Sequence, residues 1–136
     1  MLSALIPLDN LINFGIHFAV VAIIIVVFAA LWLWATPFDD LELIRQGNSA
    51  SAISFAGALI GFAIPLAGVV RASTSIWEVL PWSVIALVAQ LLGLWIATRI
   101  MHGLVKPIER GETAAGIFVA GIAVTIGILN AACMGG

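Results

Sequence analysis

The stretch that decides the fold occurs twice: residues 47–67 are GNSASAISFAGALIGFAIPLA, and residues 111–131 are GETAAGIFVAGIAVTIGILNA. The two copies align at a constant offset of 64 residues without a gap. The identical pairs in and just before the two copies are Ile44/Ile108, Gly47/Gly111, Ala50/Ala114, Ile53/Ile117, Ala56/Ala120, Gly57/Gly121, Ile64/Ile128 and Ala67/Ala131. A self-match of this length indicates an internal duplication.

The composition places the chain in a membrane. Hydrophobic residues make up 63% of the 136 residues and charged residues only 9%, whereas a soluble domain carries about a quarter charged residues. So few charges cannot cover a surface that faces water, so most of the exterior must face lipid. The net charge of −2 gives no reason to expect a nucleic-acid partner.

Four apolar runs are long enough to cross a bilayer as helices. They cover about Leu11–Trp34, Ser49–Val70, Pro81–Met101 and Thr113–Met134. We predict an all-α transmembrane fold, a four-helix membrane bundle made of two parallel two-helix repeats. It forms a single membrane domain over residues 1–136, with repeat one at about 11–71 and repeat two at about 78–134.

The first apolar run is expected to remain as a membrane anchor. No Lys or Arg precedes it, and no small-x-small cleavage signal follows it, so it lacks the features of a signal peptide. Trp32 and Trp34 near its end are expected in an aromatic belt at the interface.

The basic residues predict the orientation of the spans. The first and third connections with their flanks hold four of them, Arg45, Arg99, Lys106 and Arg110, whereas the second connection holds only Arg71. Because cytoplasmic loops carry the excess of Lys and Arg, both termini are predicted on the outer, periplasmic side.

Small residues recur at helical spacing in the second and fourth spans. The residues that we expect to carry helix packing are Gly57, Gly61, Pro65, Ala120 and Gly127. Small side chains let helix backbones approach closely in lipid, so these two spans are predicted to form the centre of the bundle. A narrow pore or substrate groove between their small faces is the alternative.

Polar residues inside spans are the default candidates for function. Here they are Asn130, Gln90, His17 and Cys133, all expected in the outer half or at mid-depth. The simplest interpretation is that the two amides hydrogen-bond across helices; a ligand, ion or proton site is the alternative. We expect no metal site, because the single Cys and the two His, His17 and His102, are too few and too far apart.

No catalytic set is visible, and no cofactor is expected. The chain has no Ser-His-Asp set on one side and no Gly-rich phosphate loop after a strand. An enzyme that uses Cys133 as nucleophile is a distant third hypothesis.

The connections on the cytoplasmic side carry most of the charges. These residues are the predicted docking surface for a partner: Asp39, Asp40, Glu42, Arg45, Lys106 and Arg110. Their simplest interpretation is that they form solvated turns.

Four segments resemble one family of bacterial membrane proteins. They are Asn48-Ser-Ala-Ser-Ala-Ile-Ser-Phe-Ala-Gly57, Gly61-Phe-Ala-Ile-Pro-Leu66, Thr113-Ala-Ala-Gly116 and Leu129-Asn-Ala-Ala-Cys-Met134. In these segments the chain resembles the YjfL-type inner-membrane proteins, and the resemblance extends from the first span to Met134. It implies four spans, two tandem copies of a domain of unknown function and a place in the bacterial inner membrane, and it implies no activity.

Two functions from different classes follow. The leading hypothesis is a non-enzymatic scaffold or accessory subunit of a membrane complex, which contacts lipid and associates with itself or with other membrane proteins. The alternative is a small ion channel or transporter whose path is lined by the second and fourth helices.

Overall fold

The computed structural model describes residues 5–100 and 103–134, and the regular structure in these ranges is entirely helical. The elements are α2 (Leu8–Ala35), α3 (Asp40–Arg45), α4 (Ser49–Ala72), α5 (Ile76–Ile100), α6 (Val105–Glu109) and α7 (Thr113–Cys133). Within the described ranges, the four long helices α2, α4, α5 and α7 are long and apolar enough to cross a membrane. The predicted all-α fold with four spans is therefore confirmed.

The third span begins earlier than predicted. Helix α5 starts at Ile76, and Pro81 lies inside it. A proline ring removes the hydrogen bond to the carbonyl four residues before, here that of Trp77, whose side chain is 75% exposed at the start of the helix. Pro81 is the sixth residue of α5, so the lost hydrogen bond lies close to the start of the helix. The predicted end at Met101 lies outside the described residues.

The two short helices end in the same way, 64 residues apart. Gly47 after α3 has φ 85° and Gly111 after α6 has φ 79°. In the first repeat the N–H of Asn48 donates to the carbonyl of Leu43, and in the second the N–H of Glu112 donates to that of Pro107, both at 2.9 Å. This is the Schellman ending, which requires the left-handed conformation that glycine adopts without strain.

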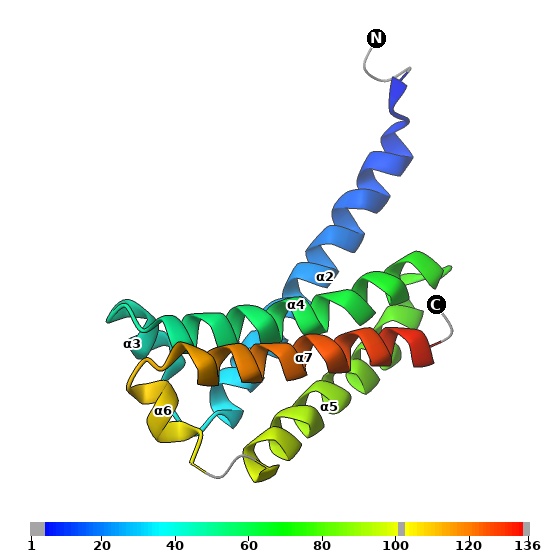
Figure 1. Ribbon diagram of the computed structural model, residues 1–136. Coiled ribbons are helices and arrows are strands. Elements are labelled where there is room, and N and C mark those ends of the chain that lie inside the picture. The colour runs from blue at the N-terminus through cyan, green and yellow to red at the C-terminus, as the bar shows by residue number, and fades with distance from the viewer. Residues whose placement is uncertain (1–4, 101–102, 135–136) are drawn as a thin grey trace.

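Helices α4 and α7 lie side by side and run in the same direction (Figure 1). A Cβ atom added at Gly57 would overlap the Cβ of Ala120, and one added at Gly127 would overlap the carbonyl of Gly61. Glycine therefore sets how closely the two backbones approach, as expected for helix pairs in lipid.

Helices α2 and α5 cover one side of this pair. Helix α2 contacts the others through its C-terminal half, where Phe28 stacks on Phe62 with ring centroids 4.3 Å apart. Its N-terminal half leaves the bundle (Figure 1). Trp32, expected in the interfacial belt, is instead 1% exposed, whereas Trp34 is 84% exposed. The difference arises because the two side chains lie on opposite faces of α2.

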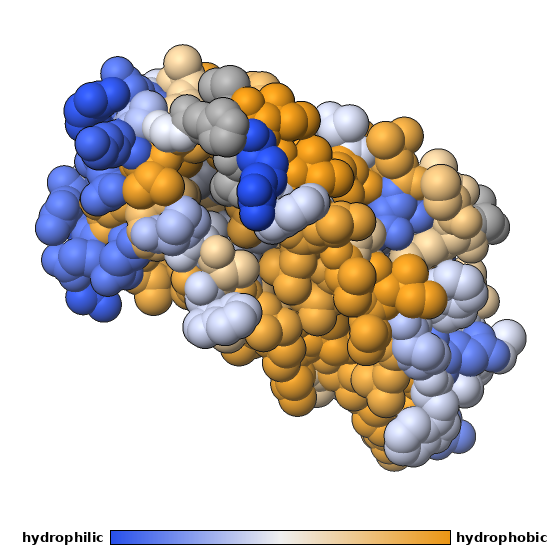
Figure 2. Space-filling view, turned by 90° about the horizontal axis from the view of Figure 1, so that it is seen from below, coloured by the Kyte–Doolittle hydropathy of each residue, from blue (hydrophilic) through white to orange (hydrophobic). Residues whose placement is uncertain are grey.

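Most of the surface between the two ends is hydrophobic in the face shown in Figure 2. Hydrophilic residues gather mainly towards the ends, and one of these ends carries α3 and α6 (Figure 1). This distribution matches a bundle whose middle faces lipid and whose ends face water.

Candidate functional site

The two intramembrane amides join α5 to α7. The side-chain nitrogen of Gln90 on α5 donates to the carbonyl of Ala123 at 3.2 Å. In return, the side-chain nitrogen of Asn130 on α7 donates to the carbonyl of Ala86 on α5 at 3.3 Å. Each helix thus supplies one amide to the other, and such interhelical hydrogen bonds stabilise membrane proteins by about 1 kcal/mol each.

Gln90 retains one buried acceptor. Its side chain is 1% exposed, and its Oε1 atom accepts no hydrogen bond from the described residues. The nitrogen of the same amide packs against α4, because a Cβ added at Gly61 would lie 2.8 Å from Nε2. The amide therefore fills its space between the helices.

The other two residues of the expected polar site are His17 and Cys133. His17 belongs to the half of α2 that leaves the bundle, and its Nδ1 lies 2.8 Å from the carbonyl of Asn13 in its own helix. Cys133 is exposed at the end of α7. The N-terminal half of α2, which carries His17, leaves the bundle (Figure 1), so His17 does not join the two amides. Cys133 lies three residues after Asn130 on the same helix, and its place in the expected polar site stays a prediction. His102 lies outside the described residues.

The small residues of α4 and α7 leave no room for a path between these helices. A Cβ added at Gly116 would overlap the backbone of Ala50, and one added at Gly61 would overlap the backbone of Ala123. Backbones in direct contact from Ala50 to Gly61 exclude water and ions there. The alternative path between the second and fourth helices of one chain therefore does not fit the geometry. Pro65, the remaining residue that we expect to carry helix packing, is buried on α4.

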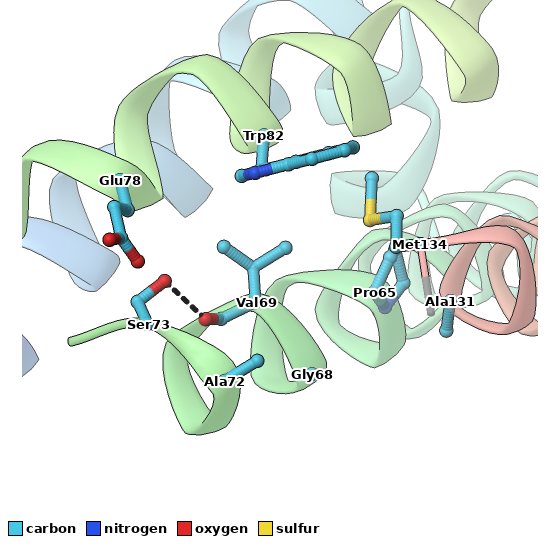
Figure 3. Close-up of a pocket in the computed structure, with 9 residues that line it drawn as sticks. All are labelled: Pro65, Gly68, Val69, Ala72, Ser73, Glu78, Trp82, Ala131 and Met134. Carbon is cyan, nitrogen blue, oxygen red and sulfur yellow. Dashed lines mark hydrogen bonds between the residues drawn. The ribbon is translucent and has the colours of Figure 1, made fainter. Parts of the chain in front are cut away.

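A small recess lies at the end opposite to α3 and α6, between α4, α5 and α7 (Figure 3). Its volume is about 80 Å³, which is room for a few water molecules. Its lining residues are Pro65, Gly68, Val69, Ala72, Ser73, Glu78, Trp82, Ala131 and Met134. Its polar groups already have partners: Ser73 donates to the Val69 carbonyl at 2.6 Å, and Glu78 accepts from the hydroxyl of Thr74 at 3.0 Å.

Asp40 at the opposite end is a buried carboxylate. Its side chain is 1% exposed, so it cannot belong to the docking surface, and that prediction is wrong for this residue. The hydroxyl of Ser51 donates to Oδ1 at 2.7 Å, and the hydroxyl of Thr36 donates to Oδ2 at 2.9 Å. Burial raises the pKa of Asp40 more than these two hydrogen bonds lower it.

The second repeat shows what the fold requires at these positions. At the offset of 64, Leu104 corresponds to Asp40 and Ala115 to Ser51. Leu104 is 5% exposed and Ala115 is 8% exposed. An apolar pair therefore fills the same place in the other repeat. The apolar residues at the equivalent positions of the second repeat are the feature of the sequence that could have indicated the burial of Asp40.

The remaining charges of the predicted docking surface are exposed at the end formed by α3 and α6. These residues are Asp39, Glu42, Arg45, Lys106 and Arg110. Asn48 joins the two connections there, because its side-chain nitrogen donates to the carbonyl of Ile108 at 2.7 Å. Its Oδ1 accepts from the N–H of Ser51 at 3.0 Å and thereby caps α4. The exposed charges thus sit on one connected surface.

Four apolar helices, with amides that join helices and charges at the ends, define a multi-span α-helical membrane protein. The chain matches the family model described as Domain of Unknown Function (DUF350) over residues 5–134, and it belongs to this family. It is 35% identical over 127 residues to the UPF0719 inner membrane protein YjfL of Escherichia coli strain K12, which covers 93% of this chain and 96% of that protein. The protein of the same name from Escherichia coli O157:H7 gives the same values. The resemblance found in the sequence is confirmed; no solved structure matches the chain.

Proposed function

We propose that this membrane protein is a non-enzymatic scaffold or accessory subunit of a complex in the bacterial inner membrane. The observation that carries the proposal is the use of the intramembrane amides. Gln90 and Asn130 bind backbone carbonyls across α5 and α7 and so contribute to packing. The inner-membrane name of the Escherichia coli relative supports the location.

The partner surface in this proposal is the end formed by α3 and α6. Lys106 and Arg110 are exposed on or beside α6, and Arg110 pairs with Glu112 at 3.3 Å between exposed side chains. Exposed pairs of this kind add little stability, so these charges are available for a partner. With both termini in the periplasm, this surface faces the cytoplasm, where a soluble protein or the cytoplasmic loop of another membrane protein can reach it.

The first experiment tests docking in native membranes. Tagged chains are cross-linked in the cell of origin, and the protein adducts of wild type, Lys106→Glu/Arg110→Glu, Arg71→Glu and Asn130→Ala are compared. The scaffold role predicts that a discrete adduct disappears only in the double variant. Arg71→Glu is the matched control, because it reverses an exposed charge at the opposite end. An adduct that survives in the double variant contradicts docking at this surface.

The second experiment tests the conduit alternative. The purified protein in liposomes is assayed for the flux of monovalent ions and small solutes. The scaffold role predicts the flux of protein-free liposomes. A flux above that level which falls in Asn130→Ala would instead establish a path beside the amides and overturn the proposal.

A further inference from the structure

Helix α3 is held against the bundle through a carboxyl group. Of the six residues of α3, all within the described part of the chain, only Asp40 is buried. One of its oxygens lies 2.9 Å from the hydroxyl of Thr36, directly after α2. The other lies 2.7 Å from the hydroxyl of Ser51, in the first turn of α4. Helices α2, α3 and α4 therefore meet at one titratable side chain.

The second repeat forms the same junction without a polar side chain. Each of the three polar residues has an apolar counterpart at the offset of 64: Ile100, Leu104 and Ala115. Helix α6 is anchored by Leu104 and by Ile108, which are 5% and 0% exposed. Ile44 on α3, the counterpart of Ile108, is only half-buried. The fold therefore does not require a carboxyl group at this junction, and the attachment of α3 depends on one more than that of α6 does.

The hydrogen bonds of the junction suit the protonated form of Asp40. The hydroxyl of Thr36 lies 3.2 Å from the carbonyl of Leu33 as well as 2.9 Å from Oδ2 of Asp40. When Asp40 is protonated, its O–H donates to the Thr36 oxygen, and the Thr36 hydroxyl turns its own hydrogen to Leu33. Ser51 still donates to the other carboxyl oxygen, so each of these polar hydrogens has an acceptor. When Asp40 is charged, the two hydroxyls donate to it but bring no positive charge, and a buried unpaired charge is costly.

The charged groups of the neighbouring helices do not offset a charge at this junction. The titratable residues of α2 are Asp9 and His17, and both lie in its N-terminal half. Helix α4 has no charged residue before Arg71 at its far end. Arg99 of α5 lies 5.2 Å from the centroid of an indole ring of its own helix. Helices α2, α4 and α5 thus supply no cation to the carboxyl group.

The charged groups beside α3 also leave Asp40 unpaired. Arg45 pairs with Glu42 at 3.3 Å on the exposed side of the helix. Asp39, the preceding residue, is a second carboxylate. Burial, and to a smaller extent the charge of Asp39, raise the pKa of Asp40 more than the hydrogen bonds from Ser51 and Thr36 lower it.

We propose that Asp40 is a proton-binding site at the end formed by α3 and α6, that the bound proton holds α3 against α2 and α4, and that its loss releases α3. Release lets the charged carboxylate reach water, whereas the apolar anchors of α6 hold that helix at every pH. Asp39, Glu42 and Arg45 move with α3. The switch therefore also alters the docking surface, and this consequence alone rests on the proposed function.

The direction of the switch follows from linkage. In released α3 the carboxyl group has its ordinary pKa of 3.8, and in docked α3 the pKa is raised. Between these two pKa values the ratio of released to docked α3 grows by up to about tenfold for each pH unit, and it is constant above the raised pKa. Release is therefore favoured as the pH rises.

Thiol accessibility measures the release of α3. In a Cys133→Ser background, Ile44→Cys places a reporter on α3, and Ile108→Cys places one at the equivalent position of α6. Each variant is purified in lipid nanodiscs and reacted with dithiodipyridine between pH 4 and pH 8, with Asp40 intact and with Asp40→Asn. Asparagine has the shape of the neutral acid and keeps both hydrogen bonds without a titratable group. The ratio of the two labelling rates at one pH removes the pH dependence of the thiol itself.

The proposal expects this ratio to rise with pH for Ile44→Cys, by up to about tenfold per pH unit, and to stay constant for Ile108→Cys. A constant ratio for Ile44→Cys would show that the proton does not hold α3 and would overturn the proposal. An equal rise at both reporters would show that this whole end loosens, and would overturn it as well. No partner is present, so the outcome is separate from that of the docking experiment.

Transfer of the apolar junction into the first repeat provides a second test. Asp40→Leu/Ser51→Ala introduces the residues found at the equivalent positions of the second repeat. Labelling of Ile44→Cys in this background should follow that in Asp40→Asn at every pH. Asp39→Asn is the matched control, because it removes the neighbouring exposed carboxylate and should retain the rise with pH. A rise that persists in Asp40→Leu/Ser51→Ala would assign the switch to another group and contradict the proposal.

Discussion

Asp40 is a buried residue at which the two repeats differ in chemistry. Its carboxylate is buried against the hydroxyls of Thr36 and Ser51, where the second repeat buries Leu104. The ion pairs found among the described residues join Arg45 to Glu42 and Arg110 to Glu112, so neither involves Asp40. Without a cation beside it, burial disfavours the charged form.

The first prediction concerns the pH dependence of stability. Because the pKa of Asp40 is raised above its ordinary value of 3.8, the folded chain keeps this proton at pH values where the unfolded chain has lost it. The contribution of the protonated Asp40 to the free energy of unfolding is therefore complete below pH 3.8. It is lost as the pH rises through the raised pKa of Asp40 in the folded state. Asp40→Asn should flatten that decline and should melt at a higher temperature than wild type at pH 8.

The measurement is thermal unfolding in detergent between pH 4 and pH 8. Glu109→Gln is the control, because it removes an exposed carboxylate near the same end and should leave the pH profile unchanged. A profile for Asp40→Asn that falls as steeply as that of wild type would show that another group causes the decline.

At the scale of secondary-structure elements, Asn48 links two helices. It caps α4, and its side chain also donates to a carbonyl at the end of α6. Its counterpart at the offset of 64 is Glu112, whose side chain makes no capping hydrogen bond to α7. The two repeats therefore share a backbone turn but not the side-chain contact that joins the connections. The Asn48 amide is thus a side-chain link between the two connections.

The second prediction compares these equivalent positions. Asn48→Ala should destabilise the protein by about 1–2 kcal/mol, because it removes a helix cap and the link to Ile108. Glu112→Ala should change stability by less than about 0.5 kcal/mol, because it removes only an exposed ion pair. Equilibrium unfolding in mixed micelles measures both values. Equal losses in the two variants would show that neither the cap nor the link to Ile108 contributes measurably to stability.

At the scale of the whole molecule, the orientation of the bundle stays a prediction. Helices α4 and α7 both end at the side where α5 begins, and α3 and α6 lie at the other side (Figure 1). The excess of Lys and Arg on the α3 and α6 side predicts that this side faces the cytoplasm. Cys133, exposed at the end of α7, is then in the periplasm.

The third prediction follows from that orientation. A membrane-impermeant maleimide added to intact cells with a permeabilised outer membrane should label Cys133. In Cys133→Ser/Ser49→Cys, the single thiol is exposed at the start of α4 and should react only after the inner membrane is opened. The reverse pattern of labelling would invert the topology and place the α3 and α6 end in the periplasm.

The sequence by itself determined the class of protein and the positions of the spans, because hydrophobicity and helix length are local properties of a segment. It also showed the duplication, since Ala56-Gly57 and Ala120-Gly121 match without a gap. Only the tertiary structure decided which faces meet, because a repeat in sequence does not specify how each helix is rotated about its axis. The same rotation buries Asp40, directs Gln90 and Asn130 to opposing backbones, and leaves Gly121 open. The divergence of α2, which separates His17 from those amides, also depends on packing between helices that no single segment encodes.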